Sequence, residues 1–537
     1  MPSDEQLEGR AASRAVLAGI AIILLVYAVA LARGWPQHGT ELILAAEEAA
    51  EPARRRGIDV GHERPGAAAQ EAAALAAAPA HPPPPHWMVL PFVSLLAAIA
   101  ILPLSRHTEH WWEHNHNKFF VAAGLGLLTL LYYACLHPTT VERHFLGHAL
   151  VHRGGDSFSW SLPAAVIANA IFQDFVPFIV LLFSLYTISG GIRIEGDLPA
   201  RPLTNASFIA VGGVLASLIG TTGAAMLLIR PLLETNRERR YVSHTVVFYI
   251  FVVCNCGGCL LPLGDPPLFL GYVHGVPFLW TASLWRQWLL VNVLLLGIYY
   301  LYDRLRVYPK ETRRDVAADE TRVHRLRFGG IWPNVPLLLG VVLAVGLLDP
   351  SKQVPGTAWY PWLYLREITL LSLVGVSLLV GPESVRQGNN FNYGAIIEVA
   401  ALFIGIFLCM QPALQILHEE GRALGINTAP RFFWITGALS SVLDNAPTYL
   451  VFFETAQTLS PNDPTNVAGV PAKLLAAISL GAVFMGANTY IGNGPNFMVK
   501  TIAEKSGVRM PSFFGYMVYS GVFLIPIFGL VTWIFFL

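Results

Sequence analysis

The chain is poor in charge for its length of 537 residues. Asp, Glu, Lys and Arg together make up 13% of it, about half of the roughly 25% that is usual in soluble domains. Hydrophobic residues make up 54%. This balance excludes an ordinary soluble protein and is typical of a membrane protein with many spans. Lys plus Arg and Asp plus Glu both total 35, so no basic excess indicates binding to nucleic acid.

Cysteines and the common catalytic motifs are also scarce. Three of the five cysteines, Cys254, Cys256 and Cys259, fall in one apolar run, which does not resemble an extracellular disulfide framework. Their spacing leaves a redox or metal site open, but thiols in a Gly-rich segment more often fill space as small apolar groups. The sequence has no Walker motif, nucleophile elbow or zincin pattern. ATP-driven pumping and hydrolysis therefore have no basis in it.

The N-terminal part predicts two segments that precede the main body. Residues 1–35 contain the apolar run 15–32, which predicts either a signal peptide or a first membrane helix. Residues 36–86 are rich in Ala, Pro, Glu and Arg and show no apolar period. We expect them to form an extracytoplasmic linker that is disordered or partly helical.

From residue 87 onward, apolar segments recur and predict an all-α polytopic membrane protein with about 10–11 spans. Segment 206–232 is exceptional because arginines flank both of its ends, and positive flanks tend to stay in the cytoplasm. A single crossing cannot place both ends there. We expect a re-entrant hairpin that enters from the cytoplasm and turns near residues 220–223. Segment 432–455 is the mirror case, a hairpin that enters from outside.

Each hairpin is followed by a segment that Gly and Pro interrupt. These interruptions lie at 255–267 and 486–496, and Gly-Asp-Pro-Pro at 264–267 aligns with Gly-Asn-Gly-Pro 228 residues later. The chain thus reads as two oppositely oriented copies of one unit. The first repeat covers 87–303, a basic cytoplasmic linker covers 304–330, and the second repeat covers 331–537.

Interrupted helices in a bilayer indicate a polar site. A break exposes backbone amides and carbonyls, which hydrocarbon cannot satisfy, so it is tolerated only beside protein or a polar cavity. The N-termini of half-helices attract anions, and unwound carbonyls attract cations. Inverted repeats also supply two similar conformations, each open to one side. Together these features predict a secondary transporter.

Three stretches, 219–233, 255–270 and Ser-Ser-Val-Leu-Asp-Asn-Ala-Pro-Thr at 440–448, resemble the ion transporter superfamily. The likeness is greatest to its NhaD-type sodium/proton antiporters and its citrate transporter branch. It covers about residue 87 to the C-terminus. The resemblance implies two inverted halves, a scaffold that makes a homodimer, and an ion site between hairpin tips and broken helices. Where relatives read Asn-Ile-Gly-Gly, this chain has Cys256 after Asn255.

Two acids are the first candidates for the ion site. Asp444 falls at a hairpin tip, where an ionisable side chain costs at least about 2.5 kcal/mol and needs a partner or a task. Asp265 precedes Pro266, so it could instead be only a helix cap. Uncharged oxygens nearby suit sodium as well. The neutral candidates are Asn255, Thr221, Thr222, Asn445, Thr448, Asn488, Thr489 and Asn493.

Glu398 and Asp174 are further acids within apolar segments and are candidate proton relays. Glu398 stands near the start of its span, so an interfacial position is an equal alternative. Arg230, at the end of the first hairpin, is expected to anchor it at the cytoplasmic interface.

Three hypotheses follow. The first is exchange of sodium (or lithium) for protons across a bacterial inner membrane by alternating access, with Asp444 and Asp265 carrying the exchange. The second is symport of citrate or a related carboxylate, held by Thr221, Thr222, Asn445 and Thr448. The third, a membrane redox or metal enzyme built on the cysteines and histidines, is the weakest. The expected partners are the lipid bilayer, sodium, protons and, in the second case, citrate. No cofactor is expected.

Overall fold

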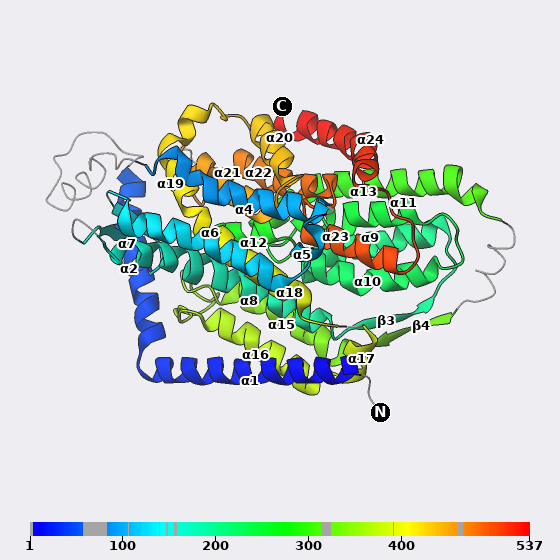
Figure 1. Ribbon diagram of the computed structural model, residues 1–537, viewed down its shortest axis with the longest axis horizontal. Coiled ribbons are helices and arrows are strands. Elements are labelled where there is room, and N and C mark those ends of the chain that lie inside the picture. Colours follow the sequence, from blue (N-terminus) through cyan, green and yellow to red (C-terminus); the bar gives the residue numbers. More distant parts are fainter. Residues whose placement is uncertain are drawn as a thin grey trace.

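The computed structural model describes residues 4–56, 83–105, 107–138, 140–146, 149–154, 158–312, 324–389, 391–459 and 465–537. Figure 1 shows that helices make up most of the described chain, with a few short strands at its edges. An all-α polytopic architecture is therefore confirmed. Residues 57–82, most of the predicted extracytoplasmic linker, lie outside the described residues.

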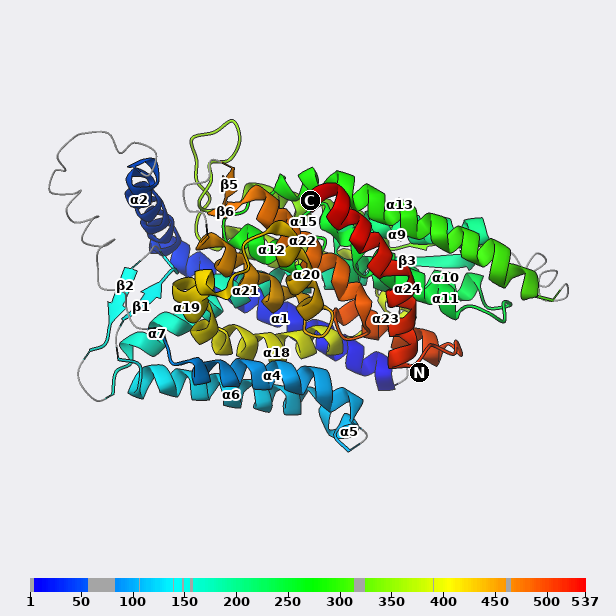
Figure 2. The ribbon, with the colours of Figure 1, turned by 90° about the horizontal axis from the view of Figure 1, so that it is seen from above.

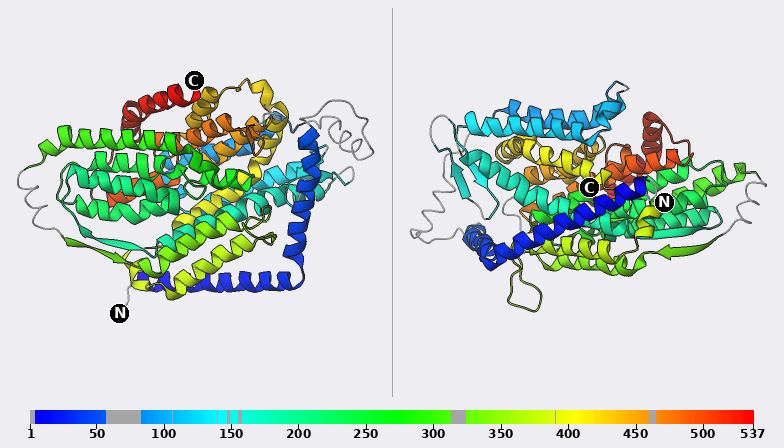
Figure 3. Two further views of the ribbon diagram at one scale, coloured as in Figure 1. Left: turned by 180° about the vertical axis from the view of Figure 1, so that it is seen from behind. Right: turned by 60° about the horizontal axis from the view of Figure 1, so that its bottom comes forward.

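Two N-terminal helices lie against the second half of the chain. α1 (Asp4–Ala32) runs along α16 (Leu365–Val380), and α2 (Trp35–Arg56) turns away from it at a steep angle (Figures 1 and 3). Tyr27 donates a hydrogen bond to the Leu363 carbonyl, and Thr40 donates to the Pro361 carbonyl. The start of the predicted linker is thus helical and docked.

Two groups of helices flank the centre of the molecule. In Figure 2, α4 and α6 lie side by side along one edge, with α18 next to them. The first-half flanking helices are α4 (Leu90–Ile101), α5 (Glu109–Trp112), α6 (Asn115–Cys135), α7 (Ser161–Ile167), the π-helix η3 (Ala168–Phe175) and α8 (Val176–Ser189). The second-half ones are α15 (Ile331–Leu347), α16, α17 (Glu383–Gly388), α18 (Gly394–Cys409) and α19 (Gln411–Glu420).

The centre is built from one sequence of elements that occurs twice. In the first half it comprises α9 (Pro202–Ile219), α10 (Thr221–Thr235), α11 (Ser243–Val253), the 3-10 turn η4 (Cys256–Cys259), α12 (Pro266–Val273) and α13 (Trp285–Tyr302). In the second half it comprises α20 (Ala429–Ser440), α21 (Asn445–Gln457), α22 (Ala472–Met485), the 3-10 turn η9 (Gly486–Asn488), α23 (Gly494–Lys505) and α24 (Phe513–Val531). α12 and α23 begin 228 residues apart, as do α13 and α24. The two copies therefore agree in order as well as in spacing.

α11 and α22 form the core of the two units. Every residue of α11 after Ser243 is buried, and α22 is buried from Ala477 to Met485. A helix that is apolar on all sides has to be enclosed by other helices. Large apolar side chains such as Leu379 and Phe514 instead face outward from α16 and α24, as a lipid-facing surface requires.

Short strands tie connections to the helical body. β3 (Arg193–Asp197) pairs antiparallel with β4 (His324–Gly329), so the end of the predicted 304–330 linker folds back onto the first repeat. Two smaller antiparallel pairs join β1 (Thr140–Arg143) to β2 (Ala149–His152) and β5 (Asn466–Val467) to β6 (Val470–Pro471).

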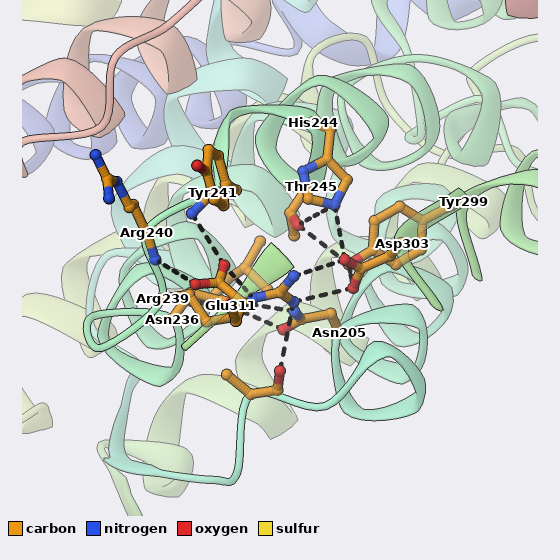
Figure 4. Close-up of polar contacts among 12 residues, drawn as sticks. Asn205, Asn236, Arg239, Arg240, Tyr241, His244, Thr245, Tyr299, Asp303 and Glu311 are labelled. Carbon is orange, nitrogen blue, oxygen red and sulfur yellow. Dashed lines mark hydrogen bonds and ion pairs between the residues drawn. The ribbon is translucent and has the colours of Figure 1, made fainter. Parts of the chain in front are cut away.

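A buried ionic cluster lies where α10, α11 and α13 end or begin (Figure 4). Arg239, in the turn after α10, donates two hydrogen bonds to Asp303, with N···O distances of 2.6 and 2.9 Å. His244 Nε2 lies 3.0 Å from an oxygen of the same carboxylate. Arg239 Nε is also 3.5 Å from Glu311. The cluster fixes the start of the linker, through Asp303 and Glu311, to the turn that follows α10.

Among the described residues, six helices are long and apolar enough to cross a membrane, and the bent pair α18–α19 would make a seventh. The sequence predicts about 10–11 spans. The rest fall in half-helices and in shorter apolar helices such as α4 and α15. This pattern identifies a multi-pass membrane protein.

Candidate functional site

Four half-helices begin at the centre of the molecule. α10 and α21 follow the two hairpin turns, and α12 and α23 follow the two helix breaks. α12 packs along α21, and α10 packs along α23. Each N-terminus carries a partial positive charge from unpaired backbone N–H groups. Two of these N-termini have an acid as their N-cap, Asp265 before α12 and Asp444 before α21.

Close backbone contacts shape both breaks. A Cβ added to Gly264 would collide with the Gly258 carbonyl, and one added to Gly492 would come 2.6 Å from the Gly486 carbonyl. The two pairs are 228 residues apart, so each break closes on itself in the same way. At the first hairpin turn, Gly220 adopts a positive φ of 81°, which glycine tolerates best.

Asp265 is the centre of a hydrogen-bond network that joins the two repeats. Its carboxylate accepts from Thr221 Oγ1 at 2.9 Å, from Asn493 Nδ2 at 3.1 Å and from Asn445 Nδ2 at 2.5 Å. Only 1% of the residue is exposed. Uncharged donors from both hairpin tips and from the second helix break therefore bind the same carboxylate, that of Asp265. This position goes beyond a simple helix cap, because no side-chain capping bond to α12 is formed.

Asn255 and Asn496 extend this network between the two breaks. Asn255 Nδ2 donates to Asn496 Oδ1 at 2.8 Å, and Asn493 Nδ2 donates to the Cys254 carbonyl at 3.0 Å. Asn496 Nδ2 donates to the Gly486 and Thr489 carbonyls. Asn496 was not among the residues predicted from the sequence, although it closes the 486–496 motif. These amides satisfy the backbone that the breaks expose.

The second hairpin turn has its own hydrogen bonds. Thr489 Oγ1 donates to the Ser441 carbonyl at 2.5 Å, and Asn488 Nδ2 donates to Ser441 Oγ at 2.9 Å. Ser441 was also missed from the sequence, because serine in an apolar helix usually bonds only its own helix. Asn488 Oδ1 and Asn445 Oδ1 are buried acceptors without a hydrogen-bond donor in the described part of the chain.

Asp444 lies on the wall of a cavity and differs from Asp265 in its contacts. Its carboxylate accepts one hydrogen bond among the described residues, from the Ala446 backbone N–H at 3.1 Å. The cavity has a volume of about 1100 Å³, and Thr221, Thr222 and Asn493 also line it. Asn445, next to Asp444, contacts Asp265 directly. The two acids are therefore joined through one residue, and one of them faces open space.

The structure leaves four predicted residues outside this network, of which Thr222 only lines the cavity. Thr448 is nearby, but its hydroxyl donates to the Asp444 carbonyl within α21. Glu398 lines the cavity and forms a 2.6 Å ion pair with Lys118 of α6. Asp174 lies in η3 and contacts His274, at the far end of α12.

The three clustered cysteines are free thiols and fully buried. The described residues contain no group of three or more His, Cys, Asp or Glu side chains placed to hold a metal ion. The thiols lie around the first helix break as small apolar groups. They are next to the backbone carbonyls to which Asn255 and Asn493 donate hydrogen bonds.

The broken helices, the joined acids and the cavity define a class of protein: a secondary transporter of the membrane. Comparison with known families gives a more particular assignment. Residues 83–153 and 156–536 match the family described as "Putative citrate transport", so the chain belongs to that family. It is also similar to the P protein of Mus musculus, with 26% identity over 244 residues, which are 41% of this chain and 28% of that protein. The chain thus matches less than a third of the length of that relative.

Proposed function

We propose that the protein exchanges sodium for protons across the membrane by alternating access. One observation carries the proposal: the Asp444 carboxylate has a single hydrogen bond and faces the cavity, while Asp265 behind it is fully supported by neutral donors. A carboxylate with a free oxygen can bind either a proton or a hard cation, and the two compete for it. Such competition at one site is what exchange requires.

Asp265 acts with Asp444 in this proposal. Its three donors fix the hairpin tips and the second break against each other, so a change in its charge alters contacts of both repeats at once. The four helix N-termini favour the ionised form of both acids, which is the form that binds a cation. Neutral oxygens of Thr222 and the hairpin backbone complete the set of ligands. Glu398 and Asp174 remain proposed proton relays.

The sidedness follows from the distribution of positive charge. Lys500 and Lys505 line the cavity at the end of α23, and Arg230 lines it on α10. Loops rich in Lys and Arg stay in the cytoplasm, so we assign this opening to the cytoplasmic side. The structure is then open inward. The hairpins α9–α10 and α20–α21 are re-entrant in this proposal, although α9 alone is long enough to cross a membrane.

The experiment is exchange in liposomes. Purified protein is reconstituted with a pH-sensitive dye inside and challenged separately with sodium, lithium, potassium and citrate. Sodium, and lithium to a similar extent, should dissipate an imposed pH gradient, whereas potassium should not. Uptake of labelled citrate without any sodium-driven proton movement would overturn the proposal.

One observation favours a second function, transport of citrate or a related carboxylate. Arg230 is only partly buried, lines the cavity and forms no ion pair with an acid in the described part of the chain. A guanidinium in this position suits a carboxylate substrate better than a cation. The family match supports the same alternative. Replacing Arg230 by Gln separates the two: it should abolish citrate uptake but leave sodium/proton exchange measurable.

The cellular setting is part of the proposal. We propose that this multi-pass protein lies in a bacterial plasma membrane and functions as a homodimer. Native mass spectrometry in detergent tests the dimer, and a monomer alone at all detergent concentrations would contradict it.

A further inference from the structure

A second group of titratable side chains lies at the ends of α12 and α21 that point away from the ion site. His274, the C-cap of α12, has its Nε2 atom 3.1 Å from Asp174 Oδ1 and its Nδ1 atom 3.8 Å from Glu454 Oε1. Glu454 is near the end of α21, and Asp174 belongs to η3 in the flanking helices. We call these three residues the outer triad.

The outer triad joins two helices of the centre, α12 and α21, to the flanking helix η3. α12 starts at Asp265 and α21 starts at Asp444, so both helices run from an ion-site acid to a member of the triad. With a rise of about 1.5 Å per residue, the triad lies roughly 13–15 Å from those acids. None of its residues lines the cavity, whose lining includes Lys500. In the inward-open arrangement proposed above, the triad therefore sits on the closed side.

The charges of the triad depend on one proton. Asp174, His274 and Glu454 have side-chain exposures of 5%, 16% and 18%, so the group is largely shielded but reachable by water. A neutral imidazole has one N–H donor, so its second nitrogen presents a lone pair to the other carboxylate. A protonated imidazole donates toward both. A proton on His274 thus turns one attraction and one repulsion into two ion pairs.

The surroundings of the triad contain one aromatic ring and few other charged groups. The ring of Phe453 packs edge-on against His274. His418 on α19 and Glu142 on β1 act on Glu454 through space. In the described part of the chain, the ion pairs of the three residues are with one another only. Among the described residues, no Lys or Arg forms an ion pair with Asp174 or Glu454, so the proton on His274 is the source of positive charge within the triad.

We propose that the outer triad is a proton-binding site that locks the outer side of the transporter. His274 takes a proton from water on the outer side, and the two ion pairs then hold α12 against η3 and against α21. Loss of that proton leaves two carboxylates around a neutral ring, and the outer side can open. The inference rests on the proposed alternating access, but it does not depend on which ion is carried.

The test uses a reporter thiol in the cavity, so it needs no transport assay. A Cβ at Gly494, which lines the cavity, meets nothing within 4 Å. Gly494→Cys is placed in a chain that carries Cys135→Ser, because Cys135 is the exposed native thiol among the five. The protein is reconstituted, and a membrane-impermeant maleimide is applied at the cytoplasmic side at constant pH. The pH of the outer side alone is varied between about 6 and about 8.5.

We expect labelling to be at least about threefold faster at the acidic outer pH, since the locked outer side keeps the cavity open inward. His274→Gln should remove this dependence on outer pH. Glu454→Gln removes the repulsion that opens the lock, so labelling should stay fast at both pH values. His137→Gln is the matched control: it is a buried histidine bonded to Tyr132 and away from α12 and α21, and it should keep the response.

The outcomes separate this inference from the proposed function. A chain that responds to outer pH but exchanges no sodium supports the lock and refutes sodium/proton exchange. Exchange without any response of labelling to outer pH refutes the lock alone. A His274→Gln chain that still responds like the unmodified one also refutes it. Size-exclusion chromatography of each variant establishes that it is folded.

Discussion

At the scale of single residues, the two acids of the proposed ion site differ in what surrounds them. Asp265 is buried and accepts three side-chain hydrogen bonds, whereas Asp444 accepts one and borders the cavity. Both are helix N-caps, although the sequence already sets Asp444 at a hairpin tip and Asp265 before Pro266. Their different neighbours support the proposal that ions reach Asp444 and that Asp265 holds the site together.

Asp444→Asn should abolish exchange, lowering sodium-driven proton movement by at least about 100-fold, because an amide can neither bind a proton nor neutralise sodium. The amide oxygen can still accept from Ala446, so thermal unfolding in detergent should change little. Glu504→Gln is the control, an acid at the mouth of the cavity that pairs with Lys500. A fully active Asp444→Asn chain would contradict the assignment.

Thr221→Val should weaken exchange about tenfold or more and cost about 1–2 kcal/mol of unfolding free energy, because it removes one donor from a buried carboxylate. The control is Thr455→Val. Thr455 is equally buried, but its hydroxyl donates to Val451 within its own helix. Equal loss of exchange in both variants would show that the Thr221 bond to Asp265 has no special role.

Replacement of Cys256 and Cys259 by serine should leave at least about half of the transport rate, because the thiols fill space beside the break. Initial rates in liposomes provide the measurement. Complete loss of transport in a folded double variant would revive the redox or metal hypothesis.

At the scale of elements, the helix breaks depend on glycine pairs that touch. Gly264→Ala should reduce transport strongly and destabilise the fold by roughly 1–3 kcal/mol, because its Cβ would meet the Gly258 carbonyl. Gly297→Ala in α13 is the control, since a Cβ there meets nothing within 4 Å. Thermal unfolding of both variants in one detergent measures the difference. A Gly264→Ala chain as stable and active as wild type would mean that the break is not rigid.

The ionic cluster of Figure 4 is also an element-scale feature, because it joins three helix ends. Asp303→Asn leaves the buried Arg239 with its 3.5 Å contact to Glu311 as the remaining ion pair and should cost about 3 kcal/mol. Glu234→Gln breaks the exposed pair with Arg237 and should cost less than about 1 kcal/mol. Denaturant unfolding in detergent compares them. Similar losses for the two would show that burial of the cluster contributes nothing.

At the scale of the whole molecule, the proposed inward-open arrangement makes the cavity accessible from one side. Labelling of Gly494→Cys by an impermeant maleimide should therefore be fast from the side of Lys500 and much slower from the opposite side. Sodium should change the two rates in opposite directions, since alternating access exchanges one opening for the other. Equal labelling from both sides would indicate a channel and not a transporter.

Much of the central fold could be predicted from the sequence. Glycines and prolines at 220–223, 264–267 and 492–495 mark the turn and both breaks, and the helices begin at or next to them. Proline in the first turn sets where α12 and α23 begin, because it lacks the backbone N–H that would bond to a preceding helical turn. The composition and apolar runs were sufficient for the membrane class.

The partners of each site residue could not be predicted. Asn445 and Asp265 are 180 residues apart, and only the packing of α21 along α12 brings them to hydrogen-bond distance. Ser441 and Asn496 gave no distinct signal, since isolated serine and asparagine are common at helix ends. The ion pair of Glu398 with Lys118 depends in the same way on how α18 packs on α6.

The sequence by itself determined that the chain lies in a membrane, that its halves repeat, and where its helices break. These are local properties, set by apolar length, by glycine and by proline. The tertiary structure alone decided that Asp265 is enclosed while Asp444 borders a cavity, and that His274 meets two acids at the far end of α12. Those facts depend on distances between helices far apart in the chain, which packing fixes and no local pattern encodes.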